Sequence, residues 1–277
     1  LELFHSLSSQ GTHGTLIDCI DKTKTSGGGR LLRKNLLSPL LDVKLLKNRL
    51  DIVEAFVKDA FILKSIRNDL QSTADIQRIL GKINKDKASP RDLYFLGDTL
   101  EKIPVWQEIL KSSNNINLKS FAKTFLNTSK LFKKIKYLIS ENTPTLLIKG
   151  NVINNGVDTD LDELREIVLN GKKWLESFQG SLRKDLGIPK LKIGYNKIFG
   201  FFIEVTNSHQ EKIPNSFIRK QTLTSSERYV TEELKEYEQK VLSAEQTIHH
   251  IESKIFNDIC IEIMNHITNL QKNASAI

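Results

Sequence analysis

The sequence predicts a mainly α-helical protein: a helical bundle core with two long antiparallel helices and a small β-rich module inserted at their tip. Three observations predict this class. The first 150 residues have helical apolar spacing, the second half has two matched heptad patterns, and an alternating pattern lies between them. At 277 residues, the chain is long enough to bury a core without disulfides or a structural metal.

The apolar spacing of the first 150 residues predicts a bundle of about six helices. Ser89-Pro90-Arg91-Asp92 is typical of a helix start, because Ser can cap the helix and Pro fits its first position. Asp92 also favours the positive end of the helix dipole. Three apolar stripes mark the expected buried faces: Leu45, Ile52, Val53 and Phe56; Leu93, Leu96, Leu100 and Ile103; Phe121, Phe125, Leu131, Ile135 and Leu138.

Two heptad patterns of equal length predict an antiparallel helix pair. Each has apolar or small residues at alternating spacings of three and four: Leu161, Leu164, Val168, Gly171, Leu175, Phe178 and Leu182, and then Leu234, Tyr237, Val241, Ala244, Ile248, Ile251 and Ile255. A helix from Thr231 to about Leu270 would be on the order of 60 Å long. We expect it to protrude as a stalk.

Between the heptad patterns the period changes from helical to alternating. Leu191, Ile193 and Tyr195 alternate with other residues, and the same holds for Phe201, Ile203 and Val205 after a turn at Asn196-Lys197 and Gly200. This pattern predicts a β-hairpin. A further strand is expected around residues 217–223, because Pro214-Asn215 is typical of a turn.

Several chemistries have no motif in the chain. Cys19 and Cys260 are far apart, and the six histidines have no zinc-ligand spacing with cysteine. The glycine clusters at residues 27–29 and 171 lack the spacing of a phosphate-binding loop, and no nucleophile elbow or dinucleotide fingerprint is present. No apolar run approaches the roughly 18 residues of a membrane span. We therefore expect no catalytic residue, no cofactor site, no metal site and no membrane partner.

The net charge of +8 includes an excess of bases in the predicted β module. This excess favours contact with a polyanion, and bases, amides and hydroxyls are the usual phosphate-contacting side chains. The candidates for contact with a DNA backbone are Lys192, Asn196, Lys197, Arg219, Lys220, Gln221, Thr222, Thr224 and Ser225. The alternative is that these are solvated turn residues. Tyr195, Phe199, Phe201 and Phe202 are interpreted as the core of the module rather than as base-stacking residues.

Long segments of the chain resemble the MutS family of bacterial DNA mismatch repair proteins. The resemblance rests on GYNKIFGFFIEVTNSHQEKIP (Gly194 to Pro214), IRKQTLTSSERYVTEELKEYEQKVLSAE (Ile218 to Glu245), GTLIDCIDKTKTSGGGRLLRKNLLSPLLD (Gly14 to Asp42) and ASPRDL (Ala88 to Leu93). It implies a helical core with the outgoing lever helix at 1–175, a DNA clamp at 176–229 and the returning lever helix at 230–277. The chain is then expected to be a fragment.

The resemblance also implies a function. The clamp would hold the backbone of double-stranded, mismatched DNA without sequence preference, and the levers would couple it to an ATPase domain that this chain lacks. ATP and Mg²⁺ would belong to the full-length protein, a cytoplasmic homodimer with a MutL-like repair partner. The fragment itself is expected not to be an enzyme. Phosphate contacts would fall on Asn196, Lys197, Leu223, Thr224 and Ser225.

Two positions depart from the family pattern. Relatives commonly have Lys-Asn where this chain has Thr224-Ser225, so one phosphate-binding charge is missing there. Asn35 stands where relatives often have Trp. A different class of function is a coiled-coil arm whose β tip grips a polypeptide or a structured RNA, as a chaperone-like module does. The bases, hydroxyls and amides of the tip favour a nucleic acid over a polypeptide.

Overall fold

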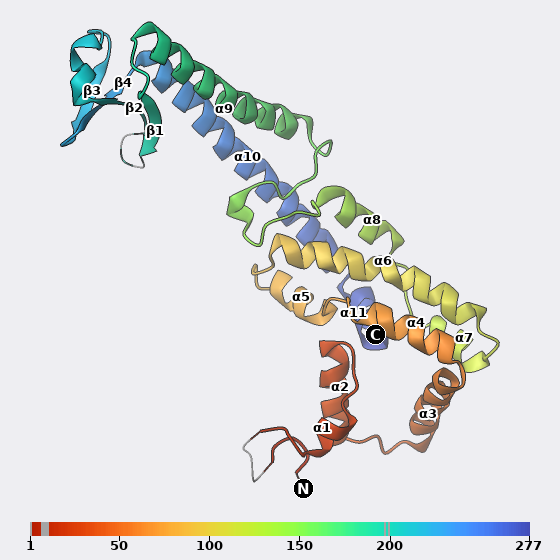
Figure 1. Cartoon of the computed structure of the whole chain (residues 1–277). Helices are drawn as coiled ribbons and strands as arrows, with labels where there is room; N and C mark the ends of the chain where they lie inside the picture. Colours follow the sequence, from red (N-terminus) through yellow and green to blue (C-terminus); the bar gives the residue numbers. More distant parts are fainter. Residues whose placement is uncertain (1, 7–10, 197, 199) are drawn as a thin grey trace. The chain divides into compact units, whose positions relative to one another are not determined.

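The predicted fold class is confirmed by a computed structural model, which describes residues 2–6, 11–196, 198 and 200–277. The chain is mainly helical, and a four-stranded antiparallel sheet is inserted between two long helices (Figure 1). It divides into two compact units, Leu1–Asn154 with Ile255–Ile277 and Asn155–Lys254. The three-part division expected from the resemblance stays a prediction. Within the described residues, no helix is long and apolar enough to cross a membrane.

The first unit is a helical bundle. Its elements are α1 (Leu16–Ile20), α2 (Ser26–Leu37), α3 (Val43–Lys58), α4 (Ala60–Leu70), α5 (Ile76–Ile83), α6 (Pro90–Ser112), α7 (Ile116–Ala122), α8 (Ser129–Leu138), the 3₁₀ turn η1 (Leu147–Lys149) and α11 (Ile267–Ala276). The described part up to residue 154 thus has eight α-helices rather than about six. The predicted number of helices was too low because α1 and α7 have only five and seven residues, too few to show a helical stripe.

Helix α6 is the centre of this bundle. The predicted helix start at Ser89 is confirmed, and Ser89 and Asp92 also form a capping box: the Ser89 side chain accepts from the Asp92 N–H at 3.2 Å, and the Asp92 carboxylate accepts from the Ser89 N–H at 2.8 Å. The stripe from Leu93 to Ile103 is completely buried, mainly against α7 and α8. At Gly97 a Cβ atom would lie 3.0 Å from Ile135, so glycine permits the close packing of α6 on α8.

The stripe of α3 is less buried than the sequence predicts. The helix forms, but the Leu45 and Val53 side chains are 53% and 52% exposed, while Ile52 and Phe56 are half-buried. The reason is that α3 packs chiefly against α4 and α7, which cover only one side of the apolar stripe.

The second unit contains the helix pair and the sheet. Its elements are α9 (Thr159–Asp185), β1 (Lys192–Asn196), β2 (Gly200–Thr206), the 3₁₀ turn η2 (Asn207–Lys212), β3 (Ile218–Thr222), β4 (Ser226–Val230) and the first part of α10 (Glu232–Asn265). The predicted hairpin and third strand are present, in the sheet order β1-β2-β4-β3. Sequence reasoning missed β4, because Glu227 and Arg228 interrupt its apolar pattern.

The heptad prediction is confirmed, because α9 and α10 pack against each other in antiparallel orientation. At Gly171 a Cβ atom would lie 3.1 Å from both Tyr237 and Val241, and the Trp174 ring stacks on Tyr237 with centroids 4.7 Å apart. Further along, Arg165 Nη2 donates to Glu252 Oε1 at 2.6 Å. All predicted heptad positions are buried or half-buried. The second long helix is shorter than predicted, however: it was expected to reach about Leu270, but α10 ends at Asn265 and α11 begins at Ile267.

Candidate nucleic-acid interface

The sheet has one apolar face and one polar face. Ile193, Ile203 and Tyr229 are paired in register on β1, β2 and β4, and they pack with Leu234 and the C-terminal part of α9. Side chains alternate between the two faces of a strand. The neighbouring positions therefore lie on the opposite face, which is available for contact with a partner.

On the polar face, a row of four side chains crosses all four strands. Lys192, Glu204, Arg228 and Gln221 are paired in register on β1, β2, β4 and β3. The Arg228 guanidinium donates to Glu204 Oε2 and to Gln221 Oε1, both at 2.9 Å, and lies over the Phe202 ring at 4.2 Å. The positive charge of Arg228 is thus offset within the sheet, whereas Lys192, at the end of the row, has no recorded ion pair in the described part of the chain.

On the other face, Arg219 is also neutralised. Its Nη1 donates to Glu227 Oε1 at 3.1 Å, and the buried Glu227 carboxylate accepts a second hydrogen bond from the Tyr229 hydroxyl. The Tyr229 bond, with help from Arg219, lowers the pKa of the Glu227 carboxyl. Burial, together with the same hydrogen bond, raises the pKa of the Tyr229 hydroxyl to about 12. Glu227 is therefore ionised and Tyr229 neutral at neutral pH.

The two loops with predicted phosphate contacts lie at opposite ends of the sheet. Asn196 pairs with Gly200 at the start of β2, so the β1–β2 turn is at that end. Thr206, at the other end of β2, pairs with Ser226, which follows the β3–β4 loop of Leu223, Thr224 and Ser225. The seven residues of β2 span roughly 20 Å. The predicted contacts therefore form two separate groups rather than one.

Asn207 holds the β3–β4 loop, and sequence reasoning did not single it out. Its backbone N–H donates to the Ser225 carbonyl at 3.2 Å, and its side-chain Nδ2 donates to the Thr224 carbonyl at 3.1 Å. The Leu223 N–H donates to the Ser226 carbonyl at 2.8 Å. Thr224 and Ser225 are exposed, so both hydroxyls are presented on a loop whose backbone is fixed.

On β3, Lys220 is the residue best placed to contribute a free charge. The register shifts between Arg219 and Gln221, so Lys220 is the extra residue of a β-bulge, and it is exposed. Within the described residues, no ion pair is recorded for it. Thr222, the last residue of β3, is also exposed. Among the predicted site lysines that the structure describes, Lys220 and Lys192 thus have charges that the sheet does not offset.

At the other end of the sheet, the β1–β2 turn is shaped by glycine. Asn196 Oδ1 accepts from the Ile198 N–H at 2.8 Å, while Lys197 lies outside the described residues. Gly200 has a φ of 78° and lies directly against the Glu238 carboxylate of α10. A negative side chain beside this turn opposes a phosphate there.

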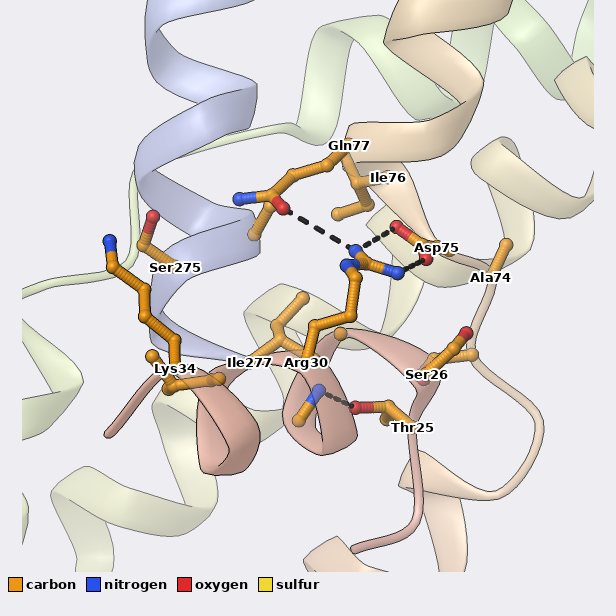
Figure 2. A pocket seen from close by; sticks show the side chains of 15 residues that line it. Thr25, Ser26, Arg30, Lys34, Ala74, Asp75, Ile76, Gln77, Ser275 and Ile277 are labelled. Carbon is orange, nitrogen blue, oxygen red and sulfur yellow. Dashed lines mark hydrogen bonds and ion pairs between the residues drawn. The ribbon is translucent and has the colours of Figure 1, made fainter. Parts of the chain in front are cut away.

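The first unit contains a pocket of about 330 Å³ beside the start of α2. Figure 2 shows Arg30 reaching from α2 to Asp75 and Gln77 at the start of α5. Arg30 Nη2 donates to Asp75 Oδ1 at 2.9 Å, and this bidentate pair lowers the pKa of Asp75. The Arg30–Asp75 ion pair joins α2 to the start of α5. Because Asp75 offsets the Arg30 charge, this pocket is not an obvious anion site.

Among the described residues, no group of three or more His, Cys, Asp or Glu side chains could hold a metal ion. Burial raises the pKa of the half-buried Cys260 thiol to about 12, which disfavours the thiolate form.

These features define a class: a helical protein in which an antiparallel helix pair carries a small sheet with one polar face. The chain belongs to the MutS domain III family, whose model matches residues 1–277. It is similar to proteins described as "DNA mismatch repair protein MutS" from Salinibacter ruber (38% identity, all of this chain, 30% of that protein), Christiangramia forsetii (39%, all of this chain, 32%) and Clostridioides difficile (40%, all of this chain, 30%). The chain spans about a third of the length of these relatives.

Proposed function

We propose that this chain is the core and clamp region of a DNA mismatch repair protein, and that its β module holds the backbone of double-stranded DNA. The observation that carries the proposal is the pair of uncompensated lysines, Lys192 and Lys220, on a sheet that offsets its arginines internally. Contacts of this kind bind phosphates without reading base sequence. The description of the similar proteins as DNA mismatch repair proteins supports DNA as the polyanion.

The helix pair gives this binding a mechanical role in the proposal. A packed seam of two helices is stiff, so a rotation at one end is transmitted as a displacement at the other, in the manner of a lever. In the full-length protein, the levers would relay the state of an ATPase domain that binds ATP and Mg²⁺. The same proposal includes a cytoplasmic homodimer, a MutL-like repair partner, and no enzymatic activity in this region itself.

The proposal is tested by reversing the two uncompensated charges. We expect Lys192→Glu with Lys220→Glu to weaken binding to duplexes of different sequence about equally, because phosphate contacts carry no sequence information. The slope of log K against log salt should fall by about one per lost contact. Fluorescence anisotropy with labelled duplexes at several salt concentrations measures both quantities.

A matched control reverses two exposed lysines of α10, Lys240→Glu with Lys254→Glu, and leaves the sheet unchanged. Equal losses in both double variants would show that only net charge matters and would contradict the proposed interface. Stronger binding of transfer RNA than of duplex DNA in competition would instead favour a structured RNA as the partner.

A further inference from the structure

A groove of about 430 Å³ lies beside the polar face of the sheet, outside the residues that sequence reasoning selected, except for Lys192. It is lined by the end of α9, the segment before β1 and the polar face of β1 and β2, through Arg183, Pro189, Lys190, Lys192, Glu204 and Thr206. Three of these six residues are bases and one is an acid. The groove thus brings together basic side chains from segments that are separate in the sequence.

The single acid of the groove is already neutralised. Glu204 Oε2 accepts from Arg228 Nε at 2.9 Å, and the Glu204 side chain is only 34% exposed. Arg228 is itself held by Gln221 and by the Phe202 ring. Glu204 is therefore paired with Arg228, and it does not offset the charges of the three bases that line the groove.

The bases are arranged to receive an anion. Arg183 Nε donates to the Leu191 carbonyl at 2.7 Å, which fixes the guanidinium and leaves its two terminal nitrogens without a recorded bond in the described part of the chain. Lys190 and Lys192 are exposed and, among the described residues, also have no recorded partner. A guanidinium fork with two flexible ammonium groups is a combination that suits a phosphate group.

The groove lies at the same end of the sheet as the β3–β4 loop. Its residues Lys192 and Thr206 are at the start of β1 and the end of β2, and Thr206 pairs with Ser226 beside the β3–β4 loop. The next residue, Asn207, makes the two hydrogen bonds that hold this loop. The groove and the loop are thus adjacent, whereas the β1–β2 turn and Glu238 are at the other end.

We infer that the groove formed by Arg183, Lys190 and Lys192 binds a phosphate of the DNA backbone, next to the contacts of the β3–β4 loop. This inference rests on the proposed function, because it identifies a further contact of the same interface. The ligand is a phosphodiester of duplex DNA, while free phosphate has the same chemistry and serves as a probe.

The test removes charge from the groove without changing the β3 edge. Arg183→Gln with Lys190→Gln should weaken duplex binding on the order of threefold to tenfold and reduce the salt slope by about one. The matched control is Lys184→Gln with Lys240→Gln, two exposed lysines that do not line the groove. Lys190→Gln alone keeps the Arg183–Leu191 hydrogen bond and should give part of the same loss in a fully folded protein.

A second measurement is independent of duplex binding. Titration of the protein with inorganic phosphate should shift the NMR signals of the Arg183 side chain and of the residue 190–192 amides, and duplex DNA should shift the same signals at lower concentration. The inference is overturned if the groove variant and the control variant have equal affinity and equal salt slope. The proposed function still holds in that case if the Lys192/Lys220 variant loses binding. No duplex binding by the unchanged protein overturns both. No shift at Arg183 with phosphate overturns the groove alone.

Discussion

At the residue scale, backbone conformation and close contacts explain why particular positions are glycine. Gly194 and Gly200 flank the β1–β2 turn, but for different reasons. At Gly194, which has an ordinary φ, a Cβ atom would lie 2.6 Å from the Phe202 ring. At Gly200, the φ of 78° is unfavourable for any residue with a side chain. The flexible Glu238 carboxylate beside Gly200 can move away, so the backbone dominates the cost of a substitution there.

We predict that Gly200→Ala lowers the free energy of unfolding by about 1–2 kcal/mol, the cost of a left-handed backbone for a residue with a Cβ atom. Glu238→Ala in the same chain should not restore stability. The control is Gly180→Ala in α9, where no atom lies within 4 Å of a Cβ and helix propensity should add about 0.5–1 kcal/mol. Urea denaturation measures both changes. Rescue by Glu238→Ala would show that the carboxylate contact, rather than φ, limits the position.

At the element scale, the seam between α9 and α10 contains one buried ion pair. The Glu252 side chain is 1% exposed and Arg165 is 16% exposed, and Arg165 also donates to Asn155 Oδ1 at 2.8 Å. The pair therefore joins α10 to α9 and to the segment that precedes α9. A buried ion pair in a heptad seam can fix the register of the helices.

We predict that Glu252→Leu destabilises the second unit by on the order of 3 kcal/mol, because the largely buried Arg165 would lose the Glu252 carboxylate and keep the longer ion pair with Asp162 at 3.4 Å. Arg165→Met combined with Glu252→Leu should be much less destabilising, since an apolar pair leaves no buried charge. A double-mutant cycle from denaturant unfolding measures the coupling. Additive losses in the two single variants and the double variant would mean that the pair does not act as a unit.

At the scale of the whole molecule, each compact unit has its own buried core. Leu100 is completely buried in the first unit and Ile203 in the second. Each truncation to Ala should cost about 2–5 kcal/mol. We predict that Leu100→Ala increases hydrogen exchange in α6 and α8 with little change in the sheet, and that Ile203→Ala does the reverse. Mass spectrometry of exchanged peptides measures this, and a uniform increase in either variant would indicate a single cooperative unit.

Much of this architecture could be predicted from the sequence, because periodicity reports on local packing. The predictions of a helix start at Ser89, of the buried stripe of α6 and of both heptad patterns are confirmed. Strand β4 was missed because its buried Glu227 is compensated by Tyr229 and Arg219, and a compensated charge has no signature in a single sequence. The separation of the two loops was also missed, because strand register sets it. The role of Asn207 depends on the same tertiary pairing.

The hydrogen bond from the Asn207 side chain to the β3–β4 loop would be lost if Asn207 were deamidated. Asn207 is exposed, so water has access to its side-chain amide. Conversion to aspartate would replace the NH₂ group that donates to the Thr224 carbonyl with a carboxylate oxygen, so an attraction would become a repulsion. A change of one dalton would then remove one of the hydrogen bonds that hold the loop and add a negative charge beside it.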